Sequence, residues 1–270
     1  MDKLKIAIIG TGGIAMGAHL PALKNIPDAE VIAACDIKED ALDKACEQYE
    51  IKNKFTDYKK LLEMDEIDVV HVCTPNISHC PIAIDSLKAG KHVLCEKPIA
   101  RNVEEAQQIV DVVSKVKNKF MVAQCIRFTS EAECLKRFID AGDLGDIYFA
   151  RVWALRRRGI PGWGVFTDKE QQGGGPLIDI GVHAIDQAMF LLGNPTPISV
   201  SGGSYTKIGN VAGHVGFAGQ WDHNNYTVED FASGFVRFSN GASMVIESSF
   251  AANLANDVVK NVFLGDKGGA

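Results

Sequence analysis

The sequence predicts an N-terminal α/β domain with a doubly wound parallel sheet and a C-terminal α+β domain with an open-faced, mostly antiparallel sheet. Up to Gln124, short apolar runs alternate with helical patterns, as in parallel strands joined by right-handed helical crossovers. After Gln124 the apolar runs lengthen and lose most intervening helices, and Asn240-Gly241 is a strong hairpin signal. We therefore expect domains at 1–124 and 125–270, with strands in the second at 147–155, 198–204, 227–238, 242–251 and 257–264.

The composition is that of an ordinary globular protein and argues against several functional classes. Of the 270 residues, 46% are hydrophobic and 23% are charged, and the net charge of −6 argues against nucleic-acid binding. The apolar run Ile6–Ile9 is too short for a signal peptide, and no later run is long enough to span a membrane. The 7 cysteines are odd in number and contain no C-x-x-C, so we expect reduced thiols in a cytoplasmic protein and no metal site.

A glycine-rich turn follows the first predicted strand, Lys5–Ile9, and leads into a helix. The run Gly10–Ala15 has the pattern G-x-G-x-x-A. Gly10 suits the tight turn, Gly12 lets the backbone approach a pyrophosphate, and the small Ala15 permits close packing of helix on strand. The helix N-terminus then faces the phosphates. The strand, turn and helix together predict a dinucleotide-binding Rossmann domain, whereas the glycines alone would indicate only a turn.

The next predicted strand, Ala29–Cys35, ends in Asp36. A carboxylate at this place can accept hydrogen bonds from ribose hydroxyls and would repel a 2′-phosphate, so the sequence favours NAD over NADP. The alternative is that Asp36 only caps the following helix.

Polar residues also follow the predicted strand Asp68–Cys73, where Thr74-Pro75-Asn76 precede a helix. Ligands of open α/β sheets bind at the carboxyl ends of the strands, so Thr74 and Asn76 are candidates for cofactor contact. The alternative is that Asn76 or Ser78 merely caps the helix.

The short apolar run His92–Cys95 stops at Glu96-Lys97-Pro98. Proline has no N–H and cannot continue a ladder, so the strand ends there and presents an ammonium group at the carboxyl end of the sheet. This placement makes Lys97 a candidate catalytic residue.

In the second half, Gly173-Gly174-Gly175 introduces a helix predicted from about Pro176 to Leu192. Asp179, His183 and Asp186 follow one another at i, i+4 and i+7 and share a helix face. Most other positions are apolar, and a mostly buried helix is not expected to carry ionisable groups without a role. We therefore interpret His183 as a catalytic candidate, the alternative being an ordinary core or surface histidine.

The loop Arg156–Gly164 combines three arginines with glycines and Trp163. It is a candidate substrate lid, in which Trp163 would stack on a sugar and an arginine would pair with an acidic group. The alternatives are a solvated basic loop and a contact with another subunit.

These motifs together resemble the glucose–fructose oxidoreductase/inositol dehydrogenase (Gfo/Idh/MocA) family over nearly the whole chain. Glu-Lys-Pro combined with a glycine-rich entry to Asp-x-x-x-His is specific, whereas either motif alone is not. The residues that carry the resemblance are Gly10-x-Gly12-x-x-Ala15, Asp36, Thr74-Pro75-Asn76-x-x-His79, Glu96-Lys97-Pro98, Gln124-x-x-Arg127-Phe128, and Gly173-Gly174-Gly175 leading to Asp179-x-x-x-His183.

The resemblance implies an NAD(P)-dependent dehydrogenase that moves a hydride between a secondary alcohol of a sugar, polyol or sugar derivative and nicotinamide. It implies Lys97 and His183 as the catalytic pair, with Asp179 in the same site. The implied cofactor-binding residues are Gly10, Gly12, Gly13, Ile14, Asp36, Thr74, Pro75, Asn76, His79, Glu96, Lys97 and Gln124. The implied substrate-binding residues are Lys97, Arg127, Trp163, Asp179 and His183.

The division of roles stays open at this point. His183 suits general acid/base catalysis and Lys97 suits stabilisation of the reacting oxygen, but the roles can be exchanged or joined in a relay. A different function on the same fold is a glycosidase or lyase that keeps its NAD and oxidises the sugar only transiently. A non-catalytic NAD-binding regulator is disfavoured because it would not need Lys97, Asp179 and His183.

The family resemblance also bears on assembly and completeness. It implies a homodimer or homotetramer formed through the open sheet. Family members usually continue beyond the last predicted strand with further strands and a closing helix, so we expect this chain to be truncated at its C-terminus.

Overall fold

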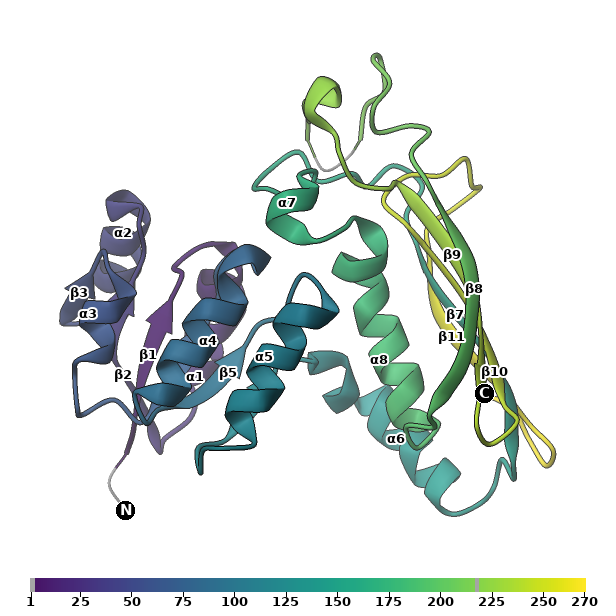
Figure 1. The fold of residues 1–270 in the computed structure, drawn as a ribbon, viewed down its shortest axis with the longest axis horizontal. Helices are drawn as coiled ribbons and strands as arrows, with labels where there is room; N and C mark the ends of the chain where they lie inside the picture. Colours follow the sequence, from purple (N-terminus) through teal and green to yellow (C-terminus); the bar gives the residue numbers. More distant parts are fainter. Residues whose placement is uncertain (1–2, 217–218) are drawn as a thin grey trace. The chain divides into compact units, whose positions relative to one another are not determined.

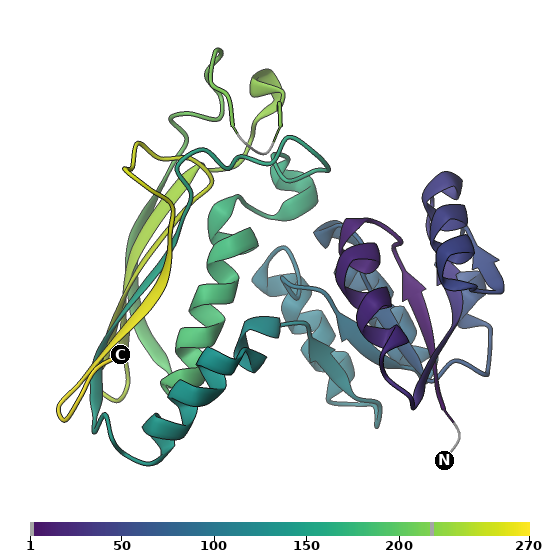
Figure 2. The ribbon, with the colours of Figure 1, turned by 180° about the vertical axis from the view of Figure 1, so that it is seen from behind.

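The computed structural model describes residues 3–216 and 219–270. The chain divides into two compact units, Met1–Ala123 and Gln124–Ala270, one residue from the boundary expected from the sequence. Each unit has its own sheet and its own buried apolar clusters, and Figures 1 and 2 show the two ribbons from opposite sides. None of the helices in the described ranges has the length and apolar character needed to cross a membrane.

The first unit is built on a six-stranded sheet in the order β3-β2-β1-β4-β5-β6, with every neighbouring pair parallel. This arrangement confirms the predicted doubly wound Rossmann sheet. The strands are β1 (Leu4–Ile9), β2 (Ala29–Cys35), β3 (Asn53–Phe55), β4 (Val69–Val72), β5 (His92–Cys95) and β6 (Phe120–Val122). The chain reverses its winding direction between β1 and β4, and open α/β sheets bind ligands at such a point.

Helices cover both faces of this sheet, as Figures 1 and 2 show from opposite sides. One buried cluster joins the sheet to α1 and α2, and another joins it to α3, α4 and α5. The helical segments are η1 (Ala15–His19), α1 (Leu20–Lys24), α2 (Glu39–Tyr49), α3 (Tyr58–Leu62), η2 (Asn76–Ser78), α4 (His79–Lys88) and α5 (Val103–Val113). The first predicted helix thus opens with one π-helical turn, η1, which the sequence did not indicate.

The second unit contains a five-stranded sheet in the order β11-β7-β10-β9-β8, in which only the β7–β10 pair is parallel. The strands are β7 (Ile147–Leu155), β8 (Pro197–Tyr205), β9 (Phe231–Phe238), β10 (Ser243–Ser249) and β11 (Val258–Gly265). The helical segments are η3 (Cys125–Phe128), α6 (Ser130–Asp140), α7 (Lys169–Gln172), η4 (Leu177–Gly181), α8 (Val182–Leu191) and η5 (His223–Asn225).

The core of the second unit lies between α8 and one face of the sheet, and no helix of the unit covers the other face in Figure 1 or Figure 2. The open-faced, mostly antiparallel sheet predicted from the sequence is therefore confirmed. The strand expected at 227–238 begins only at Phe231. Tyr226 and Val228 instead enter a separate apolar cluster with Phe250, and the buried Asp230 carboxylate accepts three backbone N–H groups from residues 207–209.

Candidate active site

The glycine-rich turn after β1 has the space and the backbone geometry that a dinucleotide requires. Gly10 has φ +92°, and a Cβ there would lie 2.6 Å from the Cys73 carbonyl oxygen, so only glycine fits between the ends of β1 and β4. At Gly12 and Gly13 a Cβ would meet no atom within 4 Å. These positions leave the backbone open beside the start of η1, where phosphates bind in this fold.

Asp36 lies at the end of β2 and connects it to the glycine-rich turn. Its Oδ2 accepts hydrogen bonds from the Thr11 N–H at 2.7 Å and the Thr11 hydroxyl at 3.1 Å. Its Oδ1 accepts from the Lys38 N–H at 2.9 Å, just before α2. The carboxylate is half-buried, so the structure orients it toward the glycine-rich turn while leaving it within reach of a ligand.

The loop after β4 carries the next group of predicted cofactor residues. The Thr74 hydroxyl oxygen is buried and has no hydrogen-bond partner among the described residues, and Asn76 is also buried. An orphaned buried hydroxyl at the carboxyl end of a strand, together with the open glycines and the Asp36 carboxylate, fits the polar parts of NAD.

His79 links the loop after β4 to the loop after β5. Its ring nitrogens lie 2.7 Å from the Pro98 carbonyl oxygen and 2.8 Å from the Thr74 carbonyl oxygen. The ring is 1% exposed, and this burial lowers the pKa of His79. Both nitrogens face backbone oxygens of these loops, and His79 stays a predicted cofactor residue.

Lys97 follows β5, as the sequence predicted, and its backbone is fixed by Glu96. The Lys97 N–H donates to Glu96 Oε2 at 3.1 Å, and Glu96 Oε1 lies 2.8 Å from His19 Nε2. Burial acts to raise the pKa of Glu96, but the hydrogen bond from His19 and the charges of His19 and Lys97 outweigh it, so the pKa is lowered. Glu96 is thus an ionised group with both oxygens bound inside the protein.

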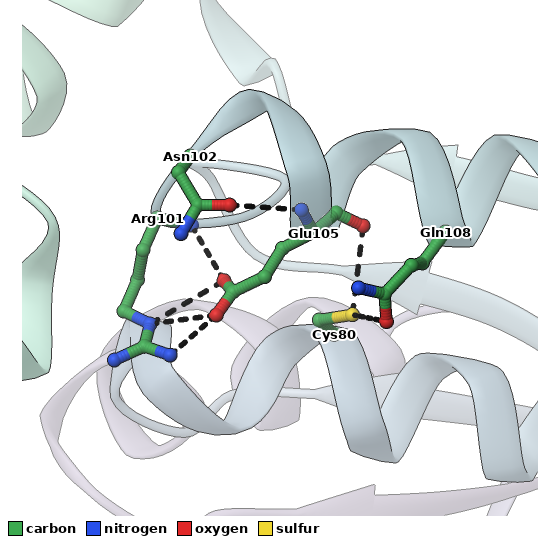
Figure 3. Close-up of polar contacts among 5 residues, drawn as sticks. All are labelled: Cys80, Arg101, Asn102, Glu105 and Gln108. Atoms are coloured by element: carbon green, nitrogen blue, oxygen red, sulfur yellow. Dashed lines mark hydrogen bonds and ion pairs between the residues drawn. The ribbon is translucent and has the colours of Figure 1, made fainter.

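The far end of this loop is fixed at the start of α5, as Figure 3 shows. Asn102 caps the helix by accepting from the Glu105 N–H at 2.8 Å. The Glu105 carboxylate reaches back to the Arg101 N–H at 3.1 Å and pairs with the Arg101 guanidinium. The segment from Glu96 to Asn102 is therefore anchored at both ends, which restricts where the Lys97 backbone can lie.

In the second unit, Glu229 fixes the start of the helix that carries Asp179 and His183. Its carboxylate accepts from the Gly175 N–H at 2.8 Å and the Leu177 N–H at 3.3 Å. A Cβ at Gly175 would lie 2.2 Å from the Glu229 carbonyl oxygen, which explains the glycine at that position. Glu229 was not among the predicted site residues, and its only signal in the sequence is that it follows the expected start of a strand and stands beside a second acid, Asp230.

The π-helix η4 and the helix α8 together form the helix predicted over 176–192. Asp179 lies in η4 and is buried, and His183 lies in the first turn of α8. A π-helical turn within a longer helix occurs often at functional sites.

His183 lines a pocket of about 230 Å³ between α8 and the sheet of the second unit. Apolar residues form much of the wall, and Arg156, Gln187 and Asn261 add polar groups. The Asn261 amide donates to the Ala184 carbonyl oxygen at 3.0 Å and to Gln187 Oε1 at 2.8 Å. The lining residues are Ile126, Ala154, Arg156, Ile180, His183, Ala184, Gln187, Val259, Lys260 and Asn261.

Arg127 and Trp163, two other predicted substrate residues, do not line this pocket. The Arg127 guanidinium pairs with the Asp186 carboxylate, which raises the Arg127 pKa, and lies over the Phe190 ring. Trp163 is exposed and packs edge-on against Phe166. From the loop 156–164, Arg156 lines the pocket instead of Trp163.

Gln124 begins the second unit, at the N-terminus of η3. Its side-chain oxygen is buried without a hydrogen-bond partner among the described residues. It stays a predicted cofactor ligand.

The family assignment follows from comparisons with known proteins. The oxidoreductase family with an NAD-binding Rossmann fold matches residues 4–124, and the GFO/IDH/MocA C-terminal domain matches residues 133–270. The chain belongs to the Gfo/Idh/MocA family. It is an NAD-dependent dehydrogenase that acts on CH–OH groups, which confirms the cofactor and the class of enzyme predicted from the sequence.

This chain covers more than two thirds of the length of each of the following relatives. D-Glucoside 3-dehydrogenase of Escherichia coli K12 is 41% identical over 270 residues, which are 100% of this chain and 77% of that protein. Levoglucosan dehydrogenase of Pseudarthrobacter phenanthrenivorans is 29% identical over 99% of this chain and 73% of its own. A solved structure of levoglucosan dehydrogenase in complex with NADH has a TM-score of 0.85 at 26% identity, covering 99% of this chain and 72% of that one.

Proposed function

We propose that this enzyme oxidises a secondary ring hydroxyl of a D-glucoside or a closely related pyranose sugar. The pocket beside His183 carries the proposal, because amide, guanidinium and ammonium groups lie among the apolar residues of its wall. A pyranose ring has the same mixture, with apolar ring faces and a rim of hydroxyls. The 41% identity with a glucoside dehydrogenase over the whole of this chain supports the choice of substrate class.

The catalytic roles proposed for this chain follow from its residue types. When bound, NAD⁺ supplies the acceptor for the hydride. His183 takes the hydroxyl proton as general base, because the usual pKa of an imidazole suits proton transfer near neutral pH. Lys97 hydrogen-bonds the reacting oxygen and stabilises the negative charge that develops there. Asp179 accepts a hydrogen bond from the substrate or orients His183.

The cofactor contacts proposed for the first unit divide among three loops. The backbone at Gly10, Gly12, Gly13 and Ile14 holds the pyrophosphate, and Asp36 binds the ribose hydroxyls. Thr74, Pro75 and Asn76 line the remaining path of the cofactor, with the buried Thr74 hydroxyl as a polar contact.

The test is to follow NADH absorbance with a panel of D-glucosides, free aldoses and polyols, using the wild-type protein and Lys97→Met. We expect glucosides to give the highest kcat/KM. Lys97→Met should abolish turnover and leave NADH binding nearly unchanged, whereas the exposed Lys115→Met should behave as the wild type. Full activity of Lys97→Met would overturn the assignment of Lys97. Cleavage of a glycoside without accumulation of NADH would favour an NAD-retaining glycosidase or lyase instead.

The open face of the second sheet is the surface through which copies of the chain are proposed to associate into a dimer or tetramer. The register places Phe235, Val245, Arg151 and Val262 in one row across β9, β10, β7 and β11 on this face. Phe235 is 42% exposed, and none of the described helices of the unit lies over this face of the sheet in Figure 1 or Figure 2. An uncovered sheet face with aromatic and aliphatic side chains is typical of an interface.

A further inference from the structure

Two buried histidines lie next to the loop that carries Lys97. His19 is the last residue of η1, and His71 lies within β4; they are 9% and 7% exposed. Their Nδ1 atoms are 3.0 Å apart, and the rings meet edge-on with an interplanar angle of 75°. The other ring nitrogen of His19, Nε2, lies 2.8 Å from Glu96 Oε1. A continuous chain of hydrogen bonds thus runs from His71 through His19 and Glu96 to the Lys97 backbone.

The two histidines lie between the sheet and the helices α1 and α2, where the neighbouring buried side chains are apolar. Because side chains alternate along a strand, His71 points to the same face as Val69 and Cys73, which pack against the cluster containing Leu20. Aliphatic residues would bury well in this layer, whereas two imidazoles must be hydrogen-bonded to avoid a penalty. Packing therefore gives no reason for the pair.

The ionised Glu96 carboxylate determines which nitrogen atoms donate in this series of hydrogen bonds. An ionised carboxylate only accepts, so His19 Nε2 carries a hydrogen and donates to Glu96 Oε1. One hydrogen then lies between the two Nδ1 atoms. Burial foremost, and then the neighbouring His19, lowers the pKa of His71 to about 4, so His71 is neutral near pH 7. Whichever ring holds the shared hydrogen, His19 keeps its Nε2 donor directed at Glu96.

We propose that His19 and His71 are positioning residues for Lys97: His71 orients the His19 ring, His19 holds the Glu96 carboxylate in place, and Glu96 holds the Lys97 N–H. The proposal rests on the catalytic role proposed for Lys97. Such outer groups act by restricting the residue that meets the substrate, and removing one from a comparable arrangement typically costs 10- to 100-fold in activity.

The test compares truncating with conservative variants at both histidines. His71→Leu removes the Nδ1 hydrogen bond, whereas the amide of His71→Asn can replace it; His19→Leu removes the donor to Glu96, whereas His19→Gln can replace it. We expect the leucine variants to lower kcat by about tenfold or more while KM for NAD⁺ changes by less than about threefold. The asparagine and glutamine variants should recover most of kcat.

The pH profile separates positioning from general loss of structure. Glu96 interacts electrostatically with several titratable groups, namely His19, His71, His79, Lys97 and the buried Cys73 and Cys95 thiols. His19 lowers the pKa of Glu96, so His19→Leu should raise that pKa, and protonation of Glu96 should then add a second loss of kcat to the acidic limb set by the general base. His19→Gln should return the limb toward its wild-type position.

Tyr58→Phe serves as the matched control, because it removes a half-buried hydrogen bond to Asp85 in the same unit without touching Glu96. It should leave kcat and the pH profile unchanged. Equal kcat in His71→Leu and the wild type, or equal defects in the leucine and conservative variants, would overturn the positioning role. If Lys97→Met is fully active, the proposed function fails and this inference fails with it. If Lys97→Met is inactive but the histidine variants have the kcat of the wild type, only this inference fails.

Discussion

Asp36 shows how one carboxylate serves both the fold and cofactor choice. It is bound to Thr11 and Lys38 by backbone hydrogen bonds, so its position does not depend on a ligand. In Asp36→Asn the side chain keeps one acceptor oxygen but loses the negative charge that would repel a 2′-phosphate. We expect the ratio of kcat/KM for NAD⁺ to that for NADP⁺ to fall by about tenfold, which corresponds to roughly 1.4 kcal/mol. Asp43→Asn, on an exposed carboxylate of α2, is the control and should leave the ratio unchanged.

His71 also predicts a pH dependence of stability. Its pKa is about 4 in the folded protein against an ordinary value of 6.5, so the unfolded chain binds a proton more readily between these values. The free energy of unfolding should therefore fall as the pH drops from about 6.5 to about 4, by roughly 3 kcal/mol from this group. Denaturant titrations across this pH range should show that the free energy of unfolding falls less with pH in His71→Leu than in the wild type. Parallel curves for the two proteins would contradict the buried neutral state of His71.

Among single residues, the motifs revealed candidate site residues at strand ends and on helices, but not the buried side chains that hold these residues in place. Lys97 and His183 were identified because a lysine before proline and a histidine on an apolar helix are unusual locally. His19 and His71 are 52 residues apart in the sequence, so their contact could not be predicted. The one available signal was a histidine at 71 within an otherwise apolar buried strand.

At the scale of elements, the helix η4–α8 depends on an anchor from another part of the chain. Glu229 binds the Gly175 and Leu177 N–H groups, which are among the donors that a helix N-terminus leaves unsatisfied. Glu229→Ala should lower the free energy of unfolding by about 1 kcal/mol, as loss of a helix cap does. Glu229→Gln keeps an acceptor oxygen and should recover part of the loss. Urea unfolding followed by tryptophan fluorescence measures both; an unchanged midpoint in Glu229→Ala would exclude the anchoring role.

The sequence predicted where most elements lie but not their local irregularities. Both helices that carry site residues were expected as uninterrupted α-helices, yet each opens with a π-helical turn. Periodicity of apolar residues cannot reveal such a turn, because one wider turn barely changes the pattern. The strand expected to begin at Thr227 was shortened by tertiary contacts of Tyr226 and Val228, which also leave no local signal.

At the scale of the whole chain, the first unit was more predictable than the second. Buried parallel strands give continuous apolar runs, and their alternation with helices restricts the topology to few solutions. The second sheet joins β7 to β10 in parallel although 87 residues separate their ends, and only a folded structure reveals that pairing. Its uncovered face was nevertheless predicted, because the sequence supplies too few helices to cover both sides.

That uncovered face gives a prediction about assembly. Phe235 lies on β9 in a row with Val245 and Arg151, so a glutamate at 235 would place a charge within the proposed interface. Because burying an unpaired charge is strongly unfavourable, Phe235→Glu should dissociate the oligomer into monomers. Sedimentation velocity at one protein concentration should show the wild type as a dimer or tetramer and the variant as a monomer. Val110→Glu, on the exposed side of α5, should sediment as the wild type does. A monomeric wild type, or an unchanged oligomer in Phe235→Glu, would show that the open sheet is not the interface.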